Sequence, residues 1–260
     1  MNKLITDIDF NFTMLKIIPL LVFLLIVSFS EAQKADMDSL QQRMEQNISD
    51  TARINTLITL ARLNLMKKDL SGASAYIDQA FELSKKNNLE IPYGLNWVRA
   101  DLLHYSRENY AAIEEMDVAL KKIEQIGDAQ ALGKAQNSMA WYYLYAGKFN
   151  ESIKLFEQNI EFAKSNKLNK VIPEAYSGLA YVYREVKNTE EQRKNLILMI
   201  EANRKINDLK FMANGYLRLG DIGMEIDSNF TYAIRQYHEC LDIQKQINDS
   251  AALSFTLLRI

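Results

Sequence analysis

The residues that most often carry catalysis or bind metals are few in this sequence. It contains two histidines, His104 and His238, and a single cysteine, Cys240. His238 and Cys240 lie two positions apart, so on a helix they point in different directions, whereas a zinc site needs several converging ligands. The stretch EIDSNFTY, which begins at Glu225, has oxygens at alternate positions like a calcium loop, but Phe230 stands where that loop needs glycine. We expect no metal site and no cofactor.

Other catalytic signatures are also absent from the sequence. It has no phosphate-cradling glycine loop, no G-x-S-x-G and no H-E-x-x-H motif. The single cysteine excludes an internal disulfide, and Cys240 is expected to fill a small helical position. The 31 basic and 33 acidic residues are interspersed, and no basic stripe predicts nucleic-acid binding. These observations favour a binding protein over an enzyme.

The stretch QNSMAWYYLYAGKFNESIKLFEQNIEFAK predicts two amphipathic helices joined by a tight turn. Gly147 suits the end of the first helix, because glycine accepts a positive φ at little steric cost. Phe149 opens the second helix, and Ser152, Phe156 and Ile160 follow it at helical spacing on one side. A single helix pair cannot bury its apolar side alone, so copies are expected.

Copies of this helix pair recur along the chain. Small residues stand at spacings of 39, 40, 40 and 40, at Ala61, Ala100, Ala140, Ala180 and Gly220. The following helices and polar joints keep the same spacing, which predicts an all-α solenoid of antiparallel helix pairs. The expected helices span 51–66, 70–86, 92–106, 109–126, 131–146, 149–165, 172–186, 189–206, 210–226 and 229–247, with another from about Ser250.

The repeats resemble the tetratricopeptide repeat family. The third repeat carries the family pattern most fully, at Met139, Ala140, Tyr143, Gly147, Phe149, Ser152 and Phe156. The second repeat is degenerate, with Arg99 in place of a hydrophobic residue, and the repeats exceed the family period of about 34 residues. The resemblance covers about residues 50–260 and implies a right-handed superhelix. It is weak for function, because this fold is a scaffold for many functions.

The predicted division of the chain has four parts. Residues 1–32 form a signal peptide, 33–50 a leading helical segment, 51–249 five repeats, and 250–260 the start of a sixth. The five repeats are expected over 51–88, 92–128, 131–168, 172–208 and 210–249.

The resemblance also implies a ligand groove on the concave surface formed by the first helix of each repeat. The groove residues carried over are Arg62, Met66, Trp97, Asp101, Tyr105, Asn137, Trp141, Tyr145, Tyr181, Arg184 and Asp221. The same alignment adds Asn55, Ile58, Leu65, His104, Lys134, Leu144, Glu174, Ser177, Glu185, Asn214, Leu217, Met224 and Glu225. Both tryptophans fall in the set, and the alternative for each is packing between helices.

The N-terminal segment contains an unbroken apolar run, Ile17–Val27. Eleven residues suit a signal peptide better than a membrane span, which needs about 20. Ser30 and Ala32 place small residues for cleavage after Ala32, and Met14 is the favoured start. The alternative is an uncleaved membrane anchor extending to Phe29.

The function expected from the sequence is an exported, most simply periplasmic, scaffold that binds a peptide or protein partner. Its membrane contact would be only through the N-terminal segment or a helix further downstream. The alternative is the N-terminal sensory region of a larger membrane-bound signalling receptor, a histidine kinase or DNA-binding regulator. After Ser250, the residues Leu253, Leu257 and Leu258 would form one apolar face. We expect either a longer protein or a partner to cover this face.

Overall fold

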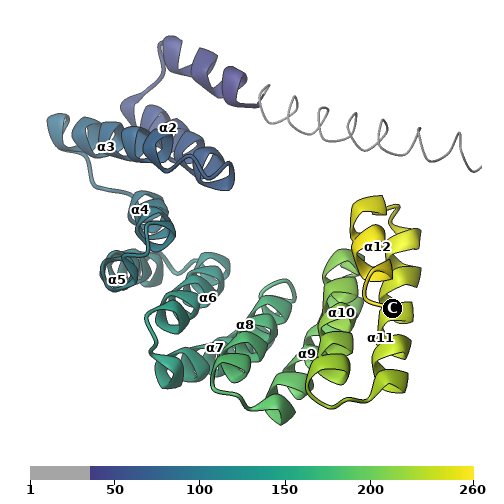
Figure 1. The fold of residues 1–260 in the computed structure, drawn as a ribbon. Coiled ribbons are helices and arrows are strands. Elements are labelled where there is room, and N and C mark those ends of the chain that lie inside the picture. Colours follow the sequence, from purple (N-terminus) through teal and green to yellow (C-terminus); the bar gives the residue numbers. More distant parts are fainter. Residues whose placement is uncertain (1–35) are drawn as a thin grey trace, which may run out of the picture. The chain divides into compact units, whose positions relative to one another are not determined.

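The computed structural model describes residues 36–260, and within that range the regular structure is entirely helical. A short helix spans 36–45, inside the predicted leading segment. Figure 1 shows the helices that follow. They are α2 (Asp50–Met66), α3 (Leu70–Lys86), α4 (Tyr93–Tyr105), α5 (Asn109–Ile126), α6 (Ala129–Tyr145), α7 (Phe149–Ser165), α8 (Ile172–Glu185), α9 (Thr189–Lys205), α10 (Leu209–Glu225), α11 (Phe230–Gln246) and α12 (Ser250–Leu257).

Helices α4 to α11 begin and end within two residues of the ranges predicted from the sequence. The chain divides into two compact units between Thr56 and Leu57, within α2. In the unit Leu57–Ile260, each odd-numbered helix from α5 onward packs against the even-numbered helix before it and the one after it. This is the all-α repeat architecture that the sequence predicted.

Every turn between helices in this unit contains one residue with positive φ, about 20 residues apart. Only Gly127 and Gly147 are glycines; the others are Lys68, Asn88, Arg107, Lys167, Lys187, Asn207, Ser228 and Asn248. At Gly147 the turn closes by two backbone bonds, from Gly147 N to Leu144 O and from Lys148 N to Tyr143 O. This pattern satisfies carbonyls at the end of one helix.

Except after Asn88 and Lys167, the residue that follows each positive-φ position is the N-cap of the next helix. Asp69, Asp128, Asn188, Asp208 and Asp249 each accept a hydrogen bond from a backbone N–H in the first turn of the following helix. Capping of this kind satisfies donors that the helix itself leaves open. Three residues therefore suffice to end one helix and start another, which keeps the paired helices close.

The predicted small residues are all buried between the paired helices. Ala61, Ala100, Ala140 and Ala180 have no exposed surface, and Gly220 is buried as well. Glycine is required where an aromatic ring crosses the helix. A Cβ at Gly178 would lie 2.1 Å from Cζ of Phe156.

Buried polar groups link α6 to its neighbours. The Asn159 side chain on α7 donates to the Gly133 carbonyl and to Oδ1 of Asn137, both at 2.7 Å. Asn137 in turn donates to the carbonyl of Val171, at the start of α8. Hydrogen bonds of this kind fix the relative position of packed helices, because a slip would leave buried groups unpaired.

The degenerate second repeat has a local explanation. Arg99, which replaces a hydrophobic residue, lies over the ring of Phe81 and forms an ion pair with Glu115 at 3.3 Å. A long side chain can cover apolar surface in this way while its charge stays partnered.

The signal peptide, its cleavage site and the alternative membrane anchor lie outside the described residues. Among residues 36–260, no helix is long and apolar enough to cross a membrane. In the same range, no three residues among the histidines, cysteines, aspartates and glutamates come together as a metal site. His238 is exposed whereas Cys240 is buried, so the two side chains lie on different sides of α11.

Candidate functional site

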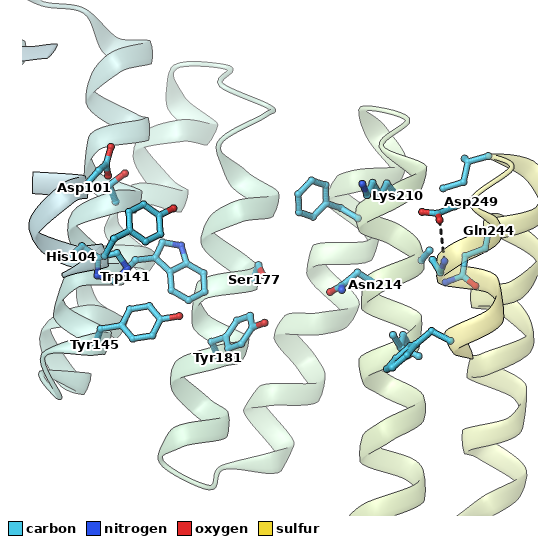
Figure 2. Close-up of a pocket in the computed structure, with 18 of the residues that line it drawn as sticks. Asp101, His104, Trp141, Tyr145, Ser177, Tyr181, Lys210, Asn214, Gln244 and Asp249 are labelled. Atoms are coloured by element: carbon cyan, nitrogen blue, oxygen red, sulfur yellow. Dashed lines mark hydrogen bonds between the residues drawn. The ribbon is translucent and has the colours of Figure 1, made fainter. Parts of the chain in front are cut away.

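A groove of about 650 Å³ lies within the unit Leu57–Ile260 and is the larger of two cavities described below. Most of its surface comes from the even-numbered helices, α4, α6, α8, α10 and α12, with the end of α11 and its turn. Its lining residues are Asp101, His104, Tyr105, Ser138, Trp141, Tyr142, Tyr145, Ser177, Tyr181, Lys210, Phe211, Ala213, Asn214, Leu217, Gln244, Ile247, Asp249, Ala252 and Phe255. Figure 2 shows the aromatic residues of α4 and α6 on one side and the residues of α10 to α12 on the other, with Ser177 and Tyr181 between them.

One wall of the groove is a continuous series of aromatic rings from three repeats. The ring centroid of His104 lies 5.6 Å from that of Tyr105 and 4.9 Å from that of Tyr145. Trp141 stacks on Tyr145 at 6.1 Å and meets Tyr181 edge-on at 5.2 Å. We call these five residues the aromatic strip. Rings in such contact hold one another in place and present a rigid apolar surface.

The two ends of the aromatic strip differ in charge. At the Tyr181 end, the guanidinium groups of Arg184 and Arg218 lie 4.7 and 4.0 Å from the ring centroid. Burial lowers the pKa of Arg218, and its two terminal nitrogens are buried without a hydrogen-bond partner. At the other end, Tyr105 and Tyr145 keep more than half of their surface exposed.

His104 is held in one orientation by its neighbours. Its Nδ1 lies 2.8 Å from Oδ1 of Asn109, and the Asn109 amide donates to the Tyr145 carbonyl. Because the amide nitrogen of Asn109 is the donor to Tyr145, its oxygen is the acceptor for His104, which places the proton on Nδ1. His104 therefore connects α4, α5 and α6 structurally.

Asp101 is the acidic residue of the aromatic wall. One of its carboxylate oxygens accepts a hydrogen bond of 2.5 Å from the hydroxyl of Tyr142. Burial raises the pKa of Asp101, and this rise is partly offset by the Tyr142 hydrogen bond and by the electrostatic influence of Arg62 and His104. Burial and the neighbouring Asp101 also raise the pKa of Tyr142 well above its ordinary value. No ion pair among the described residues includes Asp101.

The opposite wall is more polar. Lys210 and Asn214 are exposed on α10, while Asp249 caps α12 through a bond from Ala252 N. Gln244 is only 4% exposed, and its Oε1 has no hydrogen-bond partner. This wall presents separate polar groups together with Phe211 and Phe255. The first wall, by contrast, is a continuous aromatic surface.

A second cavity of about 500 Å³ lies on the other side of Asp101. Arg62, Trp97 and Lys134 line it, with Asp101 and Ser138 common to both cavities. The guanidinium of Arg62 lies 5.7 Å from the centroid of the Trp97 ring. Trp97 also packs against the buried residues between α5 and α6, so it lines a cavity and packs between helices.

The structure places nine of the 24 predicted groove residues in the larger groove. Asp101, Tyr105, Trp141, Tyr145 and Tyr181 line the larger groove, as do His104, Ser177, Asn214 and Leu217 from the wider set. Trp141 likewise has two roles, because it also meets Phe156 edge-on at 5.8 Å.

Four of the eleven groove residues named first lie elsewhere. Asn137 has no exposed surface, because its side chain bonds within the α6–α7–α8 packing. Asp221 accepts a hydrogen bond from Tyr237 and pairs with Arg259. Arg184 is exposed and pairs with Glu185, while Met66 is exposed outside both cavities. From the wider set, eight more line neither cavity: Asn55, Ile58, Leu65, Leu144, Glu174, Glu185, Met224 and Glu225.

The groove also contains residues that the sequence did not indicate. Ser138 precedes Trp141 by three positions on α6, so helical spacing alone could have found it. Gln244 lies near the end of α11, and Ile247 and Asp249 lie in the turn between α11 and α12. The sequence predicted this turn only as a link between two helices. No periodic signal marks such residues, since they depend on how the last helices fold back.

Comparison with known proteins gives a result for structure only. No family model matches the sequence, and no curated protein matches it significantly. Solved structures do match, all at low sequence identity.

The quorum sensor NprR from B. thuringiensis, in its apo form, aligns with a TM-score of 0.69 at 15% identity, over 90% of this chain and 66% of that one. NprR in complex with its cognate peptide NprX gives 0.64 at 16% identity, over 87% and 65%. A Rap protein complexed with Competence and Sporulation Factor gives 0.65 at 13%, over 89% and 70%. TPR-like repeats of a kinesin light chain from Podosopora anserina give 0.61 at 14%, over 78% and 100%.

This chain thus spans about two thirds of the NprR and Rap chains and the whole of the kinesin light chain repeats. At these identities the similarity establishes the fold and leaves the activity open. The described part of the chain has the fold of a tetratricopeptide-type helical-repeat protein.

Proposed function

We propose that this protein is a non-enzymatic scaffold that binds a peptide, or an extended segment of a protein, in the groove along the aromatic strip. The observation that carries the proposal is the aromatic strip itself, with Tyr105 and Tyr145 55% and 57% exposed and supported from behind by His104. Rigid aromatic side chains bury large areas at low entropic cost, and they dominate many interfaces. An exposed apolar patch of this kind on a protein surface is typical of an interaction site.

The shape of the groove supports an extended ligand. It runs over α4, α6, α8 and α10 to α12, and therefore over several repeats. NprR was solved with its cognate peptide, and the fold is shared, which makes a peptide a reasonable occupant here. The polar groups of the opposite wall, including Lys210 and Asn214, would then bond to a peptide backbone.

The polar groups of the aromatic wall favour binding over catalysis. Asp101 bonds to Tyr142 and His104 to Asn109, so each is engaged in holding the wall. A general acid or base needs to reach a reacting atom, and a nucleophile needs a base beside it. The geometry of these pairs instead supports a preformed binding surface.

Selection of random displayed peptides on the full chain tests this proposal. We expect recovered peptides to protect backbone amides of α4, α6, α8 and α10 from hydrogen exchange more than those of α5, α7 and α9. Recovery of no peptide above background, or protection confined to the odd-numbered helices, would contradict it.

Export remains a separate proposal. It is supported by the apolar run Ile17–Val27 and the small residues at Ser30 and Ala32. Mass spectrometry of the protein from its native cell envelope should find Gln33 at the N-terminus. An intact N-terminus on a cytoplasmic protein would overturn export, with no effect on the groove.

A further inference from the structure

The free end of the aromatic strip combines electron-rich rings with a carboxylate. Asp101 and Tyr105 stand four residues apart on α4, so they share a face of that helix. Tyr142, which donates to Asp101, directly follows Trp141 on α6. The exposed rings of Tyr105 and Tyr145 and the Asp101 side chain therefore belong to one region of the groove.

The charge of Asp101 is poorly compensated in the free protein. Its hydrogen-bond donor is the neutral hydroxyl of Tyr142. The cationic side chain that influences it is Arg62, from the second cavity, yet Arg62 forms no ion pair with it. Asp101 is half-buried, and a carboxylate partly removed from water without a paired cation is unfavourable. A ligand that supplies the cation would remove that penalty.

The other end of the aromatic strip already has its cations. Arg184 and Arg218 lie against the Tyr181 ring, where a further positive charge would meet repulsion. At Tyr105 and Tyr145, by contrast, no cation of the described residues lies over the ring. The rings of Tyr105 and Tyr145 are therefore the ones that a cation of the ligand can contact.

We infer that the groove binds its peptide through an arginine or lysine side chain, which lies on the rings of Tyr105 and Tyr145 beside Trp141 and pairs with Asp101. This inference rests on the peptide-binding function proposed above and adds the chemistry of the anchoring residue. A guanidinium suits the site best, because it can stack on rings and donate to a carboxylate at the same time.

The probes are three pools of acetylated heptapeptides on beads, with the central residue fixed as arginine, citrulline or glutamate and the other positions randomised. Citrulline has the shape of arginine without its charge. We expect the arginine pool to retain about ten times more of the full chain than the citrulline pool, the effect of one charge-assisted contact. The glutamate pool should retain the least.

Asp101→Asn separates the charge from the fold, since an asparagine oxygen can still accept from Tyr142. The preference for arginine over citrulline should disappear in this variant. Asp242→Asn is the matched control, because Asp242 is an exposed carboxylate on α11 outside the groove. It should keep the preference.

Three results contradict the inference in different ways. Equal retention by all three pools, lost in Tyr145→Ala, would show a peptide groove without a cation site. Retention by none of the pools would contradict the proposed function as well. A preference for arginine that persists in Asp101→Asn would also remove Asp101 from the account.

Discussion

Asn137 and Trp141 lie one turn apart on α6, and the structure gives them different tasks. Asn137 is fully buried and bonds toward α7 and α8, whereas Trp141 is half-buried and lines the groove. The difference follows from the neighbours of α6. Its first half is covered by the start of α8, as the bond from Asn137 to the Val171 carbonyl shows, and its second half is open to the groove. The buried packing and the aromatic strip are therefore separate regions that mutations should affect separately.

The largest effect on the buried region is expected from Gly178→Ala. The added Cβ would overlap the buried ring of Phe156, with 2.1 Å to its Cζ. We expect a loss of about 3 kcal/mol in the free energy of unfolding, measured with urea, because a dense core cannot absorb an extra methyl group.

Gly94→Ala is the matched control for this substitution. Its Cβ would find its nearest neighbour at 3.8 Å, an ordinary contact. Alanine within a helix should then raise stability by up to about 1 kcal/mol. Equal effects of the two substitutions would show that Phe156 does not pack as described.

A smaller loss is expected from Asn159→Ala. It would leave Oδ1 of Asn137 and the Gly133 carbonyl without their donor in a buried site, at a cost of about 2 kcal/mol. Asn166→Ala removes a similar side-chain bond, to the Phe162 carbonyl, but at an exposed position. There the change should stay within about 0.5 kcal/mol. Similar losses at both positions would argue against a special role for the buried network.

The turns offer a change of opposite sign. Lys187 adopts φ 59° at the end of α8, a left-handed conformation that is strained for lysine and unstrained for glycine. Lys187→Gly should raise stability by about 0.5–1 kcal/mol, and Gly147→Ala, where φ is 75°, should lower it by a similar amount. Thermal unfolding measures both, and a destabilised Lys187→Gly would show that its side chain matters more than its backbone.

Asp101 predicts a pH dependence of stability. Because burial raises its pKa in the folded state, ionisation disfavours folding, and stability is lost as pH rises from about 4 through that pKa. Asp101→Asn should therefore unfold at a higher temperature than the natural protein near pH 7, and the difference should shrink toward pH 4. Arg62, His104 and Tyr142 are the other ionisable groups that influence Asp101. Asp242→Asn is measured in parallel as a control, because it removes an exposed carboxylate outside the groove. A gap that widens toward pH 4 would mean that the carboxylate stabilises the fold.

The fold could be predicted from the sequence because its signal is repeated. Spacings near 40 between small residues fix the helix pairs, and the helical periodicity of Ser152, Phe156 and Ile160 fixes the buried side. The positive-φ residues were missed except at Gly147, because lysine, arginine and asparagine at these positions look like ordinary polar joints. Their bonding pattern appears only when two helices are in place.

The candidate site could be predicted in part. The register of the repeats put Trp141, Tyr145 and Tyr181 on one surface, and all three line the larger groove. It also placed Asn137 and Asp221 there, because register does not reveal which turn of a helix the next repeat covers. The wall from α10 to α12 depends on side chains near the end of α11, where no repeat position predicted a ligand surface.

The most direct test of a peptide groove is the affinity of one selected peptide for three variants of the full chain. Tyr105→Ala and Tyr145→Ala change exposed rings of the aromatic strip, and Tyr110→Ala changes a ring on α5 that is 64% exposed and lines neither cavity. Calorimetry should show a loss of about tenfold or more for each strip variant and none for Tyr110→Ala, with the melting temperature nearly constant in all three. Equal affinities in all three variants would contradict the assignment of the aromatic strip as the binding surface.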